Sequence, residues 1–256
     1  MSGAPAVTPL GWKHKWLAEP NTSWDYVARE GRPLVMNLPG APAEYANGLD
    51  AYLWRLFYDE GYALGELVWR DDRAQRQRVR EDIEQIRSQV AEVRADPAKF
   101  GGFDRNRIVI AAWGADAFPA SLVAFNSGSR GSSPVCAAVF IEAMNLDPGS
   151  PETVVATQKF SEDPNPAELA PARFADSAPP TLLMTEIFDR TGAQRADALA
   201  GAIRASGGIA VRKTYSRFVA SDPRTYLGYS ADPSTKVIRD FLKTYCPAKA
   251  TKAPKP

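Results

Sequence analysis

The sequence predicts an α/β fold, in which a mostly parallel central sheet is covered by helices on both faces. Short, nearly continuous apolar runs alternate along the chain with longer amphipathic stretches, an order typical of strands joined by crossover helices. Because the apolar runs contain few polar residues, the strands are expected to be buried on both sides, as in parallel sheets. A length of 256 residues, 45% of them hydrophobic, suits one domain of this kind.

The first predicted elements are a strand, a helix and a second strand. Residues 32–39 form a short apolar run that ends at the turn signal 39–42, where two prolines flank Gly40-Ala41. Residues 48–58 have leucines and a phenylalanine at helical spacing, and Gly61 is placed to end that helix. The apolar run 62–69 then predicts the next strand.

A long amphipathic helix is predicted at residues 72–94, because its apolar positions recur every three or four residues. The glycine pair 101–102 ends this region. Residues 107–112 are expected to form a strand, 117–125 a helix and 134–144 a further strand.

The C-terminal third repeats the strand and helix alternation. Residues 181–188 and 209–215 are predicted strands, with a helix at 195–205 between them and a last helix at 234–245. The proline-rich stretch 147–180 is predicted to be an irregular, cap-like insertion over the carboxyl edge of the sheet, where ligands bind in such folds.

One domain is expected to span residues 1–246, followed by a disordered tail at 247–256, which has little to bury. The opening residues 1–9 lack the charged and apolar regions of a signal peptide, so we expect none in this chain. A cytoplasmic protein and a mature exported one both remain open.

Charge and hydropathy exclude several classes of function. With 31 basic and 30 acidic residues the net charge is +1, and no basic stripe suggests a nucleic-acid partner. No apolar window approaches the length of a membrane span. Two cysteines, Cys136 and Cys246, have no metal-binding spacing, and no pattern indicates a cofactor. We expect Cys136 to be a small buried side chain rather than half of a disulfide.

Around these elements the sequence resembles a known family. Residues 99–110, with the sequence Lys-Phe-Gly-Gly-Phe-Asp-Arg-Asn-Arg-Ile-Val-Ile, resemble the segment that leads into the nucleophile elbow of α/β-hydrolase-fold esterases and lipases. The carboxylesterase and feruloyl-esterase-like branch is the most similar. The order of elements extends the resemblance over most of 32–242, and it implies this fold and an ancestral hydrolase activity.

The resemblance places the family's nucleophile and base on residues that cannot perform those roles. The nucleophile position falls on Gly114, and the histidine position falls near Val219. A serine hydrolase needs a hydroxyl, a base within hydrogen-bond reach and a group that orients the base. The only histidine, His14, lies ahead of the predicted sheet beside two lysines. We therefore predict that the catalytic triad is degenerate.

The remaining family positions are only partly kept. The oxyanion-hole loop falls on Gly40 and Ala41, where the usual glycine-rich sequence is missing. The acid position falls on Asp189. Asp116 stands where the elbow normally has a small residue, so either the turn has opened or the carboxylate points into the former active-site cleft.

Three functions are compatible with these residues. The first is a pseudoenzyme of this fold whose cleft binds a small molecule or a partner. The second is a lyase, isomerase or cyclase that uses cleft side chains for acid–base chemistry. The third is a weak or atypical ester hydrolase, for which the serine-rich loop 126–133 could supply a displaced nucleophile, although a flexible connection between helix and strand is the expected role of that loop.

The candidate acid–base residues follow the predicted strand ends: Asp116, Glu142, Glu186, Asp189 and Tyr215. Carboxylates gathered at one edge raise one another's pKa, which keeps an acid protonated near neutral pH. Structural roles are equally open at this stage. Glu186 can pair with Arg190 or Lys213, and Asp189 can cap the helix that follows it.

The partner expected for such a cleft is a small molecule. Aromatic residues concentrate near the N-terminus, and the sequence does not choose between an edge seal of the sheet, a cleft lining and a homodimer surface. These residues are Trp12, Trp16, Trp24 and Tyr26.

Overall fold

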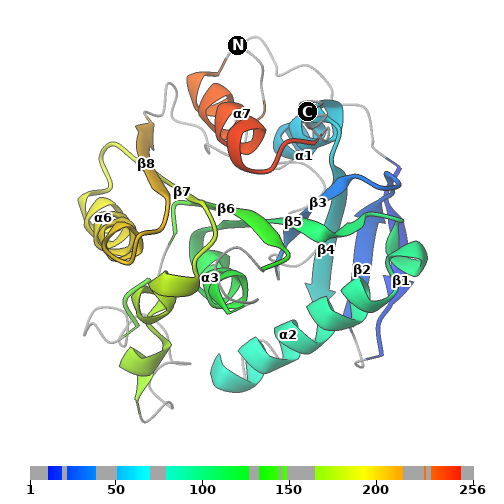
Figure 1. Cartoon of the computed structure of the whole chain (residues 1–256), viewed down its shortest axis with the longest axis horizontal. Helices are drawn as coiled ribbons and strands as arrows, with labels where there is room; N and C mark the ends of the chain where they lie inside the picture. Colours follow the sequence, from blue (N-terminus) through cyan, green and yellow to red (C-terminus); the bar gives the residue numbers. More distant parts are fainter. Residues whose placement is uncertain are drawn as a thin grey trace, which may run out of the picture.

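The computed structural model describes residues 11–18, 22–38, 51–69, 79–126, 133–143, 146–148, 165–215, 228 and 232–248. Within this part of the chain, an eight-stranded sheet runs in the order β1-β2-β4-β3-β5-β6-β7-β8 (Figure 1). The strands are β1 Lys13–Trp16, β2 Thr22–Val27, β3 Pro33–Asn37, β4 Ala63–Trp69, β5 Asp104–Trp113, β6 Val135–Ile141, β7 Thr181–Glu186 and β8 Ala210–Tyr215.

Strand pairing confirms a mostly parallel sheet. β3 pairs in parallel with both β4 and β5, and parallel pairing continues through β6, β7 and β8. Their carboxyl ends therefore meet at one edge, which is where an α/β sheet presents its ligand-binding residues. Only β1 and β2, at one side of the sheet, run antiparallel to their neighbours.

Helices cover both faces of the sheet, as the sequence predicts. α1 (Ala51–Glu60) and α7 (Pro233–Tyr245) pack on one face, and α2 (Val79–Ala95), α3 (Ala117–Phe125) and α6 (Arg190–Ala205) pack on the other (Figure 1). Each face has its own buried cluster of apolar side chains, because successive residues of a strand point to opposite sides.

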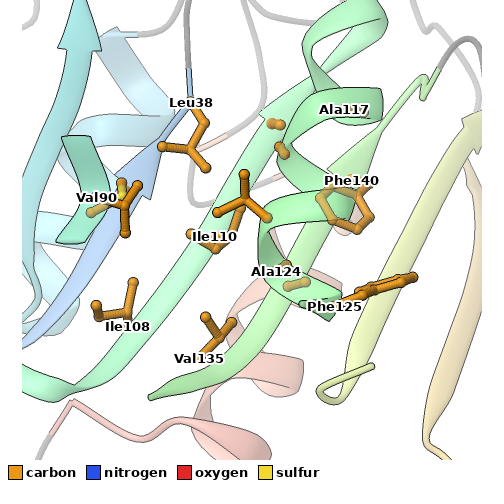
Figure 2. Packing of buried hydrophobic residues seen from close by; sticks show 14 of the residues in the cluster. Leu38, Val90, Ile108, Ile110, Ala117, Ala124, Phe125, Val135 and Phe140 are labelled. Atoms are coloured by element: carbon orange, nitrogen blue, oxygen red, sulfur yellow. The ribbon is translucent and has the colours of Figure 1, made fainter. Parts of the chain in front are cut away.

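The most apolar helix, α3, lies directly over the strands that carry the candidate site. Figure 2 shows Ala117, Ala124 and Phe125 of this helix in the same buried cluster as Ile110 of β5 and Phe140 of β6. Eight of its side chains are buried, so its position relative to the carboxyl edge of the sheet is firmly set.

The N-terminal aromatic region forms strands that the sequence did not predict. β1 is an exposed edge strand, and its lysines discourage pairing with other chains. In β2, Trp24 is fully buried against Gly65 of β4, where an added Cβ would meet the indole at 1.9 Å. Its Nε1 donates to the Phe100 carbonyl at 3.0 Å. Trp24 therefore seals this side of the sheet, one of the roles considered for it.

The two cysteines form a disulfide, contrary to our expectation. Cys136 lies near the start of β6 and Cys246 directly after α7, and the bond joins residues 110 positions apart. The packing of α7 on the sheet brings their Cα atoms to 5.4 Å, within the range that a disulfide spans. This proximity is a tertiary effect, which residue spacing does not reveal.

The packed chain extends two residues past the predicted domain end. The carbonyls of Cys246, Pro247 and Ala248 accept hydrogen bonds from Tyr62, Arg107 and Arg32, respectively. Burial raises the pKa of Tyr62, which keeps its phenol protonated and able to donate. The rest of the predicted tail lies outside the described residues.

The predicted insertion 147–180 is described at its two ends. Short 3-10 helices at Pro166–Leu169 and Pro171–Ser177 occupy its second half, and the latter packs between α3 and α6. The Ser206 hydroxyl, just after α6, donates to the Ala175 carbonyl at 2.9 Å. This part belongs to the helical layer rather than to the carboxyl edge where we expected it, because Ala175 and Phe174 complete the apolar cluster there.

Candidate functional site

A tight left-handed turn follows β5 at the position that the resemblance assigns to the nucleophile. Gly114 has φ of 53°, and the chain continues through a 3-10 turn at Gly114–Asp116 directly into α3. An L-residue pays about 1–2 kcal/mol in this backbone region, whereas glycine does not. A Cβ built on Gly114 meets no atom of the described residues within 4 Å. The backbone thus has a sharp strand-to-helix turn like that of an elbow, and no described residue occupies the place where a side chain would project.

The neighbouring strand ends in a second left-handed turn, at Glu142. Trp113 and Ile141 are paired residues of β5 and β6, so Gly114 and Glu142 follow at equivalent places. Glu142 has φ of 51° and is the one non-glycine residue with positive φ in the described chain. Its backbone N–H donates to the Met184 carbonyl of β7 at 2.8 Å. A strained residue that its surroundings hold in place is typical of functional sites.

Both oxygens of the Glu142 carboxylate accept a hydrogen bond. Tyr215, at the end of β8, donates its hydroxyl to Oε1 at 2.5 Å, and the indole of Trp113 donates to Oε2 at 3.1 Å. Trp113 and Tyr215 both belong to the sheet face covered by α1 and α7. The turn at Glu142 breaks the strand alternation, which lets its side chain reach these two donors.

We call Glu142, Tyr215 and Trp113 the strand-end cluster. Hydrogen bonds from neutral donors to a carboxylate are short and strong when the site is partly desolvated, as here, where Tyr215 is 8% exposed. The sequence nominated Glu142 and Tyr215 separately but missed Trp113. The sequence shows that Trp113 directly precedes Gly114. It does not show the hydrogen bond from Trp113 to Glu142, because that bond depends on the pairing of β5 with β6.

The carboxylate at the family's acid position has a structural role. Asp189 precedes α6, and its Oδ1 accepts the backbone N–H of Gly192 at 2.9 Å, so it caps that helix. This is the alternative role weighed for it from the sequence. Its side chain is exposed, and the cap fixes its orientation toward the helix.

The other candidate site residues form no part of the strand-end cluster or lie outside the described residues. Asp116 ends the 3-10 turn with helical backbone angles and is half-buried, so the turn accommodates its side chain without a left-handed conformation. Glu186 ends β7 opposite Tyr215 in the β7–β8 register. Gly40, Ala41 and Val219 lie outside the described residues, as does most of the serine-rich loop.

The described residues contain no group of three side chains suited to hold a metal ion. None of the described helices has the length and apolar character needed to cross a membrane.

The chain can be compared with family models, with curated proteins and with solved structures. No protein-family model and no curated protein matches the chain. Solved structures do match. A thermostable carboxylesterase cloned from a metagenomic library has a TM-score of 0.68 and 18% identity, over 93% of this chain and 88% of that one.

Two further structures are similar to a comparable degree. An acetyl ester-xyloside bifunctional hydrolase from Caldicellulosiruptor lactoaceticus has a TM-score of 0.67 at 17% identity, over 89% of each chain. An esterase from Pyrobaculum calidifontis has a TM-score of 0.64 at 19% identity, over 87% of this chain and 80% of that one. The chain thus has an α/β-hydrolase-like fold, and the structures it resembles include esterases and an acylaminoacyl peptidase. Identities this low show the fold, and activity has to be argued from the site.

Proposed function

We propose that this protein is a non-hydrolytic protein with the α/β-hydrolase fold, which binds a small molecule at the carboxyl edge of the sheet, beside Gly114 and the strand-end cluster. One observation carries the proposal. The elbow-like turn persists with φ of 53° at Gly114, and no side chain is present at that position to attack an ester.

Serine-hydrolase chemistry depends on three groups that act as a unit. On the family's pattern, the nucleophile is replaced by Gly114 and the histidine by Val219, while Asp189 caps a helix. The one histidine, His14, lies on the edge strand β1 with its Nδ1 2.6 Å from Asp25 Oδ1. It is separated from β5 in the sheet by β2, β4 and β3, too far to serve a nucleophile at Gly114.

The topology supports a ligand site at this edge. After β3 the chain runs to α1 on one face of the sheet, and after the adjacent β5 it runs to α3 on the other face. Neighbouring connections that leave in opposite directions open a crevice at the strand ends, the usual place for ligands in such sheets. Gly114 and the strand-end cluster lie at or beside this point.

An ester-hydrolysis assay tests the proposal. Purified protein is compared with the double variant Gly114→Ser, Val219→His on short acyl esters, with Gly114→Ala as a matched control for the turn. We expect no enzymatic turnover by the wild type or by Gly114→Ala. Turnover by the double variant alone would support the assignment of both positions. Turnover by the wild type would overturn the proposal.

Acid–base catalysis without a nucleophile is the second candidate function. The observation that favours it is the 2.5 Å hydrogen bond between Tyr215 and Glu142, since such a pair can take a proton from one substrate atom and return one to another. In this role Glu142 is the base and Tyr215 the proton donor. Glu142→Gln and Tyr215→Phe would then abolish turnover of a bound substrate while preserving its binding. In a pure binding protein, the same variants change affinity alone.

A further inference from the structure

A cavity beside Tyr215 is not explained by the elbow or by the strand-end cluster. It has a volume of about 220 Å³ and lies between the carboxyl ends of β7 and β8 and the first turn of α7. Tyr215 forms part of its wall, so the cavity adjoins the strand-end cluster through a shared side chain.

Its walls combine apolar surface with hydrogen-bond acceptors. Met184, Pro233 and Val237 supply the apolar part. Thr214 and Ser234 contribute hydroxyls, and Asp232 contributes a carboxylate. Among the described residues that line the cavity, this carboxylate is the only formal charge, so the described part of the lining is negative.

The Asp232 carboxylate is held in a defined orientation. Its Oδ2 accepts the backbone N–H of Thr235 at 2.7 Å and the Thr235 hydroxyl at 2.9 Å, which caps α7. These bonds all use one oxygen. The partial positive charge of the helix N-terminus, about half an elementary charge, offsets only part of the carboxylate charge.

From this lining we infer that the cavity binds a small organic cation, a primary ammonium group carried on a short alkyl chain. The ammonium donates to Asp232 and faces the Tyr215 ring, while the alkyl chain lies against Met184 and Val237. A carboxylate ligand is disfavoured, because no cationic side chain of the described lining would meet it. The volume of about 220 Å³ has room for a short alkylammonium.

This inference rests on the proposed binding function and names the ligand class. The test uses three probes of similar size, n-butylammonium, n-butanol and butyrate, titrated into the whole protein. Binding is followed by the amide chemical shifts of the first turns of α7. Affinities in the millimolar range are expected for molecules of this size. We expect n-butylammonium to bind about tenfold more tightly than n-butanol, and butyrate to show no saturable binding.

Two variants make the test specific. Asp232→Asn removes the charge but keeps a residue that caps helices well, so α7 stays intact. It should bring the affinities for n-butylammonium and n-butanol to within about twofold of each other. Val237→Phe fills the cavity and should abolish binding of both probes, with an unchanged far-ultraviolet circular dichroism spectrum as the check on folding.

An unchanged preference in Asp232→Asn, equal binding of all three probes, or binding that survives Val237→Phe would overturn the inference. None of these results bears on ester hydrolysis, which is what tests the absence of hydrolytic chemistry. Failure of the ligand class and failure of the proposed function are therefore distinguishable.

Discussion

The turns at the ends of the neighbouring strands β5 and β6 both contain a residue with left-handed φ, but one of these residues has no side chain and the other has a carboxylate. Gly114 after β5 and Glu142 after β6 have φ of 53° and 51°. The first carries no side chain and has no described residue close to where a Cβ would lie, whereas the second carries a carboxylate that accepts hydrogen bonds from two donors. Glycine adopts this backbone without strain, while glutamate pays about 1–2 kcal/mol for it.

The contrast between Gly114 and Glu142 indicates which of the two turns has a side chain that the rest of the structure holds in place. A strained residue persists only when its surroundings stabilise it by more than the strain costs, and such residues cluster at functional sites. At Gly114 the turn is formed without strain, but glycine provides no reacting group. At Glu142 the strain places a carboxylate beside Tyr215. We therefore expect function to depend on the second turn.

The largest effect should come from the disulfide, which ties β6, the strand that ends at Glu142, to α7. A Cys136→Ala, Cys246→Ala variant should lose about 2–5 kcal/mol of unfolding free energy, because the bond closes a loop of 110 residues. Chemical denaturation measures the loss, and the reduced wild type serves as the control, which should lose a similar amount. Two reactive thiols in the native, unreduced protein would contradict this prediction.

The strain at Glu142 can be separated from its hydrogen bonds by two substitutions. Glu142→Ala removes both bonds to a charged group and should cost about 2–3 kcal/mol. Glu142→Gly removes the same bonds and also relieves the backbone, so its loss should be smaller by about 1 kcal/mol. Urea denaturation of both variants gives the difference. Equal losses would show that the left-handed turn is not retained.

At Glu142 a glycine should be more stable than an alanine because it relieves backbone strain. At Gly114, replacing glycine by alanine should introduce the same kind of strain and lower the stability. Gly114→Ala introduces a Cβ that would meet no described residue, so backbone strain is the expected cost, about 1–2 kcal/mol. The same denaturation experiment measures it. A loss near zero would mean that the turn lacks the elbow geometry.

The smallest loss of stability is expected at Asp189. Unlike Glu142, this carboxylate has a structural role, because it caps α6. Asp189→Ala should cost about 1 kcal/mol through loss of the α6 cap, and Asp189→Asn much less, since asparagine also caps helices. Ligand affinity should be unchanged in both variants. Reduced affinity in the stable Asp189→Asn protein would assign this residue to the site.

The fold was predictable where local patterns decide it. Strands β3 to β8 have apolar runs, and α2 shows the expected spacing of apolar residues, so class and order followed from the sequence. β1, with the sequence Lys-His-Lys-Trp, was missed because an exposed edge strand needs no apolar run. The disulfide was missed because it joins residues 110 positions apart.

The site was predictable only as separate residues. Glu142 and Tyr215 both followed predicted strands, but they lie 73 residues apart, and their contact requires the turn at Glu142. No glycine stands at this position, so the sequence contains no signal of a left-handed turn there. Gly114, by contrast, was assigned through the resemblance to the hydrolase family, and the turn at this residue lies directly between β5 and α3.

A fluorophosphonate probe tests the central claim most directly, because it forms a covalent adduct with the activated serine of a hydrolase. Intact-mass spectrometry follows the wild-type protein after exposure to the probe, beside the Gly114→Ser, Val219→His variant. We predict no adduct on the wild type at any residue, the serines of 126–133 included. A stoichiometric adduct on the wild type would show that a nucleophile has been retained, and would contradict this account.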